Sequence, residues 1–250
     1  MKLPTLCLIA IILTSCVTSQ HTPQQQGLVF YEGRQDAIVA SGMIDGIVPI
    51  SAMSGRSGAY GMGAYAGLDG EITIFEGKPY VTQVRGDDFT LTHRADGAAI
   101  FAVWTSNTQW QTQSVPASIN SYEQLQHFVQ QRARAAGIDT SSTAFPFLLT
   151  GAPAELIWHI NVDRTEGRPI TRELFQQSKQ TYIMREQPVT IIGFYSELHL
   201  GSFIGTYAPG ITDPETKNAM HMHLVSQDGL SAGHIDDVRL SAGMILSLPE

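Results

Sequence analysis

The chain has 250 residues, of which 43% are hydrophobic and 15% charged, and its 23 acidic against 15 basic residues give a formal net charge of −8. This composition is typical of a globular protein with one medium domain or two small ones, and it argues against a disordered, collagen-like or coiled-coil protein. Binding to nucleic acid requires clustered Lys and Arg. Because the longest basic run is Arg132-Ala133-Arg134, we expect no nucleic-acid partner.

The N-terminal residues have the pattern of a bacterial lipoprotein signal. Lys2 is followed by an apolar stretch from Leu6 to Leu13, which runs into the Leu-x-small-Cys box Leu13-Thr14-Ser15-Cys16. A bilayer span takes about 20 residues, so the stretch is too short to be a transmembrane helix. We predict a signal peptide over residues 1–15 and a lipid on Cys16. An ordinary secretory signal or a buried helix is the alternative.

Cleavage before Cys16 would leave the protein in the cell envelope, anchored by its lipid on the periplasmic or outer face. Cys7 would leave with the signal, so no thiol would remain for a disulfide, a redox pair or a nucleophile. Residues 16–26, with Thr, Ser, Pro and three successive Gln, are predicted to be the lipidated Cys and its tether. The folded domain is expected over residues 27–250, and the lipid would be its attachment to the membrane.

Short strands and tight turns follow the predicted tether. Segments 61–65, 68–75 and 78–81 have the composition of strands, and Asp69-Gly70 and Glu76-Gly77 are typical of tight turns. We therefore predict a β-meander. Further strands are expected over the following segments: 157–162, 189–195, 220–225 and 238–246.

Two segments predict helices. Residues 120–136 have apolar side chains at helical spacing, with Asn120 as a cap, Glu123 three residues later and Gly137 at the end. A second helix is expected from about Thr171.

Strands dominate the pattern, so we predict an α+β fold with mixed or antiparallel β-sheets and a few helices. Segments with Gly inside β patterns occur at 61–74 and from Gly193 onward. They suggest two structurally similar halves, although no strict repeat is present. No linker separates two domains.

Three of the eight histidines lie within 14 residues and carry the clearest chemical signal. On a strand, His221 and His223 project from the same face, while Met222 and Leu224 enter the core. A turn after the strand can return His234 opposite this pair, which predicts a three-imidazole metal site with an open position, as in catalytic zinc sites. A single His is more often a surface residue or a hydrogen-bonded core residue than a metal ligand. We assign these roles to His21, His93, His127 and His199.

A cupin-type site also uses a His-x-His pattern. It would require a Glu three or four residues after the second His, where this chain has Ser226 and Gln227. The cupin alternative is thereby weakened.

Several motifs together resemble the α-acetolactate decarboxylase family, from about Gly27 to the C-terminus. In chain order they are Gly61-Met62-Gly63, Leu68-Asp69-Gly70-Glu71, Leu149-Thr150-Gly151, Ile192-Gly193-Phe194-Tyr195, His221-x-His223 and Ser231-x-Gly233-His234. The histidines and the Leu-Asp-Gly-Glu motif are the most specific of these. The resemblance implies a two-part α+β fold, zinc on His221, His223 and His234, and a carboxylate at Glu71 near the metal. It also implies conversion of (S)-2-acetolactate, a small 2-hydroxy-3-oxo acid, to acetoin and CO2.

The three histidines and Glu71 are suited to this decarboxylation. Loss of CO2 leaves an electron pair beside the ketone, as an enediolate, and a divalent metal that chelates the hydroxyl and carbonyl oxygens would stabilise it by roughly several kcal/mol. A proton must then reach the new carbanion carbon, and Glu71 is the candidate donor, directly or through metal-bound water. Three imidazoles also suit Mn, Fe or Ni, so another divalent transition metal is an alternative to zinc.

Two departures from the family leave the substrate open. Family members carry an Arg about eight residues beyond Leu-Thr-Gly that can hold the substrate carboxylate. His159 stands there in this chain and is the candidate for a weaker carboxylate clamp, because its side chain is shorter and often neutral. The family's C-terminal Glu has no clear counterpart, although Glu250 is a candidate. The second hypothesis is therefore a non-catalytic metal- or ligand-binding lipoprotein on the same fold. A homodimer is left open.

Overall fold

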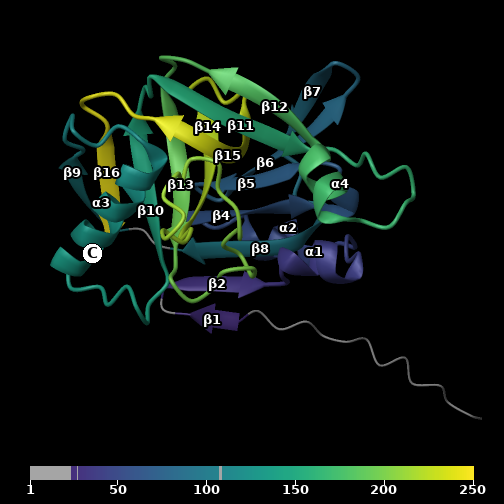
Figure 1. Ribbon diagram of the computed structural model, residues 1–250, viewed down its shortest axis with the longest axis horizontal. Helices are drawn as coiled ribbons and strands as arrows, with labels where there is room; N and C mark the ends of the chain where they lie inside the picture. The colour runs from purple at the N-terminus through teal and green to yellow at the C-terminus, as the bar shows by residue number, and fades with distance from the viewer. Residues whose placement is uncertain (1–23, 27, 107–108) are drawn as a thin grey trace, which may run out of the picture.

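Two antiparallel β-sheets packed against each other form the body of the protein (Figure 1). The computed structural model describes residues 24–26, 28–106 and 109–250. The predicted signal peptide, Cys16 and the first part of the predicted tether lie outside these residues. Within the described ranges, none of the helices has the length and apolar character needed to cross a bilayer.

The first sheet has the strand order β1-β2-β8-β4-β5-β6-β7, and β3 also pairs with β8. Its strands are β1 Gln24–Gln26, β2 Val29–Glu32, β3 Val48–Pro49, β4 Ala59–Tyr65, β5 Glu71–Phe75, β6 Lys78–Arg85, β7 Asp88–Thr92 and β8 Ala98–Ser106. The successive antiparallel pairs of β4, β5, β6 and β7 confirm the predicted meander. One detail of the tether differs from its prediction, because residues 24–26 pair with β2 and extend the sheet.

Gly70 sets the start of β5. Its φ of 140° is a conformation that L side chains rarely adopt, and a Cβ there would lie 2.2 Å from the carbonyl oxygen of Thr82. Only glycine therefore lets the chain turn this close to β6. As a result Glu71 is the first residue of β5, paired with Thr82.

The second sheet has the strand order β12-β11-β15-β14-β13-β10-β16-β9. Its strands are β9 Trp110–Ser114, β10 Phe145–Gly151, β11 Glu155–Asn161, β12 Lys179–Met184, β13 Val189–Tyr195, β14 Met220–Ser226, β15 Ala232–Arg239 and β16 Ile245–Pro249. The predicted strand over 238–246 was wrong. The chain leaves β15 after Arg239 and turns through Gly243, whose φ is 86°, before β16 joins β10 and β9. The antiparallel pairing throughout both sheets, with few helices, confirms the α+β class.

The helices are short apart from one. They are α1 Asp36–Ser41, α2 Ile50–Met53, the 3-10 turn η1 Ala66–Leu68, α3 Tyr122–Ala135 and α4 Arg172–Gln177. The cap of α3 is Ser121, whose hydroxyl accepts from the Gln124 amide, so the prediction of Asn120 as cap was wrong by one residue. The predicted second helix is confirmed, and Thr171 caps it. Sequence patterns did not indicate α1 and α2, because six and four residues are too few for a helical period to show.

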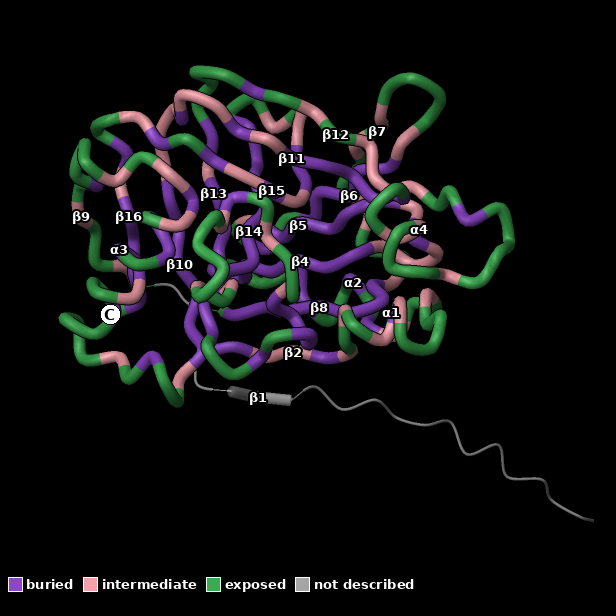
Figure 2. Tube along the Cα trace, in the orientation of Figure 1, coloured by how far each residue is buried: buried purple, intermediate pink, exposed green. Residues whose placement is uncertain are grey.

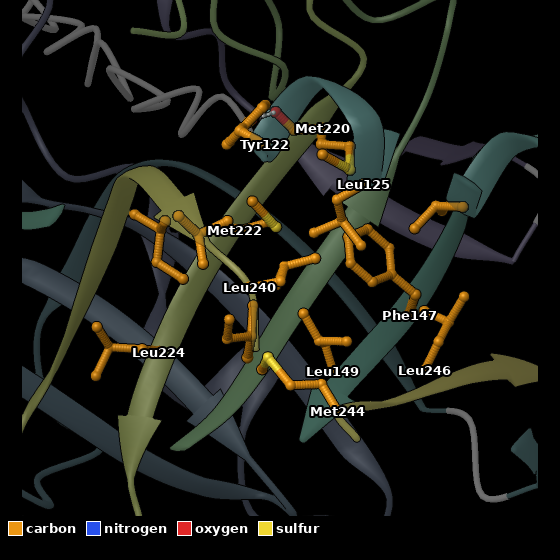
Figure 3. Packing of buried hydrophobic residues seen from close by; sticks show 14 of the residues in the cluster. Tyr122, Leu125, Phe147, Leu149, Met220, Met222, Leu224, Leu240, Met244 and Leu246 are labelled. Atoms are coloured by element: carbon orange, nitrogen blue, oxygen red, sulfur yellow. Dashed lines mark hydrogen bonds between the residues drawn. The ribbon is translucent and has the colours of Figure 1, made fainter. Parts of the chain in front are cut away.

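Most strand residues of both sheets are buried (Figure 2). Apolar side chains from the two sheets, such as Met62 and Val103 of the first and Ile192 and Val225 of the second, form one core cluster. The second sheet is also covered on its outer face by α3, where Leu125 lies beside Phe147 in a core cluster that also contains Met222 and Leu224 (Figure 3). Met222 and Leu224 thus lie in the core, as predicted. Since strand residues alternate between faces, the odd-numbered residues of β14 point the other way, toward the first sheet.

Candidate metal centre and active site

Three imidazoles meet between the two sheets. His221 and His223 lie on the same face of β14, and His223 pairs directly with His234 on the adjacent strand β15. His221 Nε2 lies 3.0 Å from His234 Nδ1, and each of the three residues has a ring nitrogen within 4.8 Å of those of the other two. The structure therefore brings together the three histidines that the sequence singled out.

Glu71 reaches the same place from the first sheet. Its Oε2 lies 3.7 Å from His223 Nε2 and its Oε1 lies 3.8 Å from His159 Nε2. Only 3% of Glu71 is exposed. Thr73, two residues further along β5, shares a 2.8 Å hydrogen bond between its Oγ1 and His223 Nδ1. The site is thus built from both sheets, with β5 facing β14 and β15.

His159 also lies in this site. It pairs with His234 across β11 and β15, and the two ring centroids are 4.6 Å apart. Its Nδ1 forms a 2.7 Å hydrogen bond with Asp236 Oδ2. This bond orients the ring and leaves Nε2 on the side of Glu71.

Burial controls the protonation of the whole cluster. It lowers the pKa of His221 to about 4 and also lowers the pKa of His159, His223 and His234 below that of an ordinary histidine. Burial raises the pKa of Glu71 well above the usual carboxyl value, and the neighbouring carboxylate of Asp236 adds to this rise. At neutral pH the imidazoles are therefore uncharged, which is the form that binds metals.

The donor set fits a divalent transition metal. His223 Nε2 is fully buried and has no hydrogen-bond partner among the described residues, although a polar atom left in this state costs about 1–3 kcal/mol. With Nε2 on a metal, His223 would donate its Nδ1–H to Thr73 Oγ1, which is the second contact that metal-bound histidines usually make. Two ligands of a tetrahedral zinc lie about 3.4 Å apart, close to the observed 3.0 Å between His221 and His234.

A cavity of about 330 Å³ leads to this cluster. Glu71, His159, His221 and His234 line its inner part together with Asn161, while α1, α4 and residues 205–209 border it elsewhere. The volume suits a small organic acid. Glu250 does not line the cavity, and its backbone N–H donates to the Gln109 carbonyl at the far edge of the sheet. The structure thus excludes Glu250 as a stand-in for the family's C-terminal Glu.

The sequence analysis missed three buried polar residues of the site. Each follows a predicted site residue by two positions on the same strand, and a period of two places both side chains on one face. The pairs are Glu71 and Thr73, His159 and Asn161, and His234 and Asp236. Extending the His221-x-His223 argument by two residues along the other strands would have found them.

Of the remaining histidines, the three that the structure describes lie outside the site, as predicted. His199 is a satisfied core residue, with its Nδ1 bonded to Ser196 Oγ, and His93 bonds to the Pro79 carbonyl. His127 is exposed on α3. His21 lies outside the described residues.

The two-sheet fold is that of solved acetolactate decarboxylases. The structure of α-acetolactate decarboxylase from Bacillus subtilis strain 168 superposes with a TM-score of 0.65 at 18% identity, over 89% of this chain and 86% of that one. A Staphylococcus aureus protein described as similar to α-acetolactate decarboxylase gives a TM-score of 0.67 at 15% identity, over 88% and 84%.

The sequence profile of the α-acetolactate decarboxylase family matches residues 31–247, so the chain belongs to this family. The α-acetolactate decarboxylase of Raoultella terrigena is 24% identical over 229 residues, which are 91% of this chain and 78% of that protein. The enzyme of the same name from Methanosarcina mazei is 22% identical over 203 residues, which are 81% of this chain and 62% of that protein. The chain thus spans less than two thirds of this second relative.

Proposed function

We propose that this protein catalyses the metal-dependent decarboxylation of (S)-2-acetolactate to acetoin and CO2. The observation that carries the proposal is the meeting of three imidazoles beside the buried Glu71, at a cavity that Glu71, His221 and His234 line. Membership of the α-acetolactate decarboxylase family supports the same reaction. The cavity would hold a small 2-hydroxy-3-oxo acid.

His221, His223 and His234 would hold the ion, zinc or another divalent transition metal. When bound, it supplies a Lewis acid that stabilises the negative charge left beside the ketone as CO2 departs. The hydrogen bond between Thr73 Oγ1 and His223 Nδ1 holds the His223 ring in place. Burial of these residues excludes bulk water, which strengthens every electrostatic contact with the developing charge.

Glu71 would provide the proton that replaces CO2. Burial raises its pKa, so the carboxyl group can keep a proton where an exposed Glu would be ionised. It approaches from β5, while the histidines stand on β14 and β15 of the other sheet. The substrate between the sheets would therefore contact the metal ligands and the proton donor together.

One assay tests this function. Metal-loaded protein should form acetoin from racemic acetolactate, and a chelator should abolish the reaction until a divalent transition metal is restored. The non-catalytic alternative draws its support from the replacement of the family Arg by His159. It would take the place of our proposal if protein that holds its metal formed no acetoin between pH 5 and pH 8.

We also propose that the protein is a lipoprotein of the cell envelope. The Leu13-Thr14-Ser15-Cys16 box after an apolar run supports cleavage before Cys16 and lipid on its sulfur. Mass spectrometry of the N-terminal peptide should find Cys16 as the first residue, with the added mass of acyl chains. A Cys16→Ser variant should lose this mass and leave the membrane fraction. A wild-type product that begins at another residue and carries no lipid would contradict the proposal.

A further inference from the structure

The geometry points to Lys179, in place of His159, as the residue that binds the carboxylate of the substrate acid. This inference rests on the proposed function, because it concerns the acid that the decarboxylase would take. Lys179 is the first residue of β12 and lines the cavity that leads to the three histidines. Among the described residues, Lys179 and Arg172 are the cationic side chains that line it.

The inner part of the cavity otherwise lacks positive charge. Glu71 and Asp236 are acidic groups, and the Nε2 of His159 lies 3.8 Å from Glu71 Oε1. The Nδ1 of His159 is already bonded to Asp236. A carboxylate entering this space needs a cation to offset its desolvation, and both ring nitrogens of His159 already face the carboxyl groups of Asp236 and Glu71.

The strand register places Lys179 beside the reaction site. On β12, Lys179 pairs with Asn161 of β11, and Thr181 pairs with His159. Residues two apart lie on one face of a sheet, so Lys179 and His159 are diagonal neighbours on the cavity side.

Lys179 has capacity for a second partner. Its Nζ lies 3.4 Å from Asp236 Oδ1, which is long for a charged hydrogen bond, and 24% of its side chain is exposed. An ammonium has three donors, so a carboxylate can be added without breaking the contact with Asp236. The other oxygen of Asp236 holds His159, and the ring of His159 lies against His234. An acid bound at Lys179 would therefore lie next to the proposed metal ligands.

The alternative is that Lys179 serves only as the counter-ion of Asp236. The two roles predict different kinetics. A substrate carboxylate loses its charge as CO2 forms, so a cation that binds it acts mainly on the ground state. Removing this cation should raise KM more than it lowers kcat. Loss of a counter-ion that positions Asp236 and His159 should instead lower kcat and weaken all ligands alike.

The test compares Lys179→Met, Lys179→Arg and, as a matched control, Lys78→Met, since Lys78 is exposed at the start of β6 and does not line the cavity. Each metal-loaded protein is titrated with two probes by calorimetry. One is 2,3-dihydroxy-2-methylbutanoate, in which the ketone of the substrate is reduced so that no CO2 leaves. The other is acetoin, which has no carboxylate. Metal content and thermal unfolding show whether each variant is folded and loaded.

We expect Lys179→Met to weaken binding of the acid by roughly 10- to 100-fold and to leave acetoin binding unchanged. Its KM for acetolactate should rise by a similar factor, with little change in kcat. Lys179→Arg should bind the acid nearly as wild type does, and Lys78→Met should do the same. Unchanged affinity of Lys179→Met for the acid, or an equal loss for acetoin, would overturn the inference. The titration needs no turnover. If wild type makes no acetoin but binds the acid through Lys179, the proposed function fails and the assignment of the carboxylate site stands.

Discussion

Replacing Glu71 with Gln should lower kcat for acetoin formation by roughly two to four powers of ten, which is the usual contribution of a positioned acid. The amide matches the carboxyl group in size but has no proton to give to the carbon that has lost CO2. Glu71 is 3% exposed, and its Oε2 lies 3.7 Å from His223 Nε2. Because the amide has the size of the carboxyl group and Glu71 is not one of the three proposed metal ligands, the substitution should leave the shape of the cavity and the metal content unchanged. Single-turnover kinetics and elemental analysis on the same sample measure both quantities.

The pH profile and a second glutamate serve as controls. A proton donor is active in its protonated form, so the wild-type rate should fall as pH rises through the pKa of Glu71, and the Gln variant should lack this decline. Glu76 lies just beyond the other end of β5 and bonds to the hydroxyl of Tyr60, outside the cavity. Glu76→Gln should therefore keep wild-type activity. A Glu71→Gln protein with nearly wild-type kcat would remove Glu71 from the mechanism.

The parts of the site that lie on a single strand could be predicted from sequence. A period of two placed His221 and His223 on one face of β14 and Met222 and Leu224 in the core, and the structure agrees. The return of His234 was predictable for the same reason, because a short turn joins adjacent antiparallel strands. Local geometry determines all of these positions.

The parts that depend on distant strand pairing could not be predicted. β11 lies beside β15, although three strands come between them in the sequence, so the contact of His159 with His234 and Asp236 has no local signal. Lys179 joins the site for the same reason, through the pairing of β12 with β11. The error at 238–246 has another origin. An apolar run hid the turn at Gly243, which sends β16 to the opposite part of the sheet.

Removing two of the three proposed metal ligands gives the largest effect that we expect on metal content. A His221→Ala and His223→Ala double variant should fall from about one ion per chain to background and lose chelator-sensitive activity, because one imidazole cannot hold a divalent ion in competition with water. Inductively coupled plasma mass spectrometry of the dialysed protein measures this content. His93→Ala is the matched control, since His93 bonds to the Pro79 carbonyl away from the cavity, and it should keep a full complement of metal.

Both residues replaced in the double variant are buried, so circular dichroism must show that the variant remains folded. A folded double variant that retains its ion would show that the metal is held elsewhere, and the mechanism built on these histidines would fall with it.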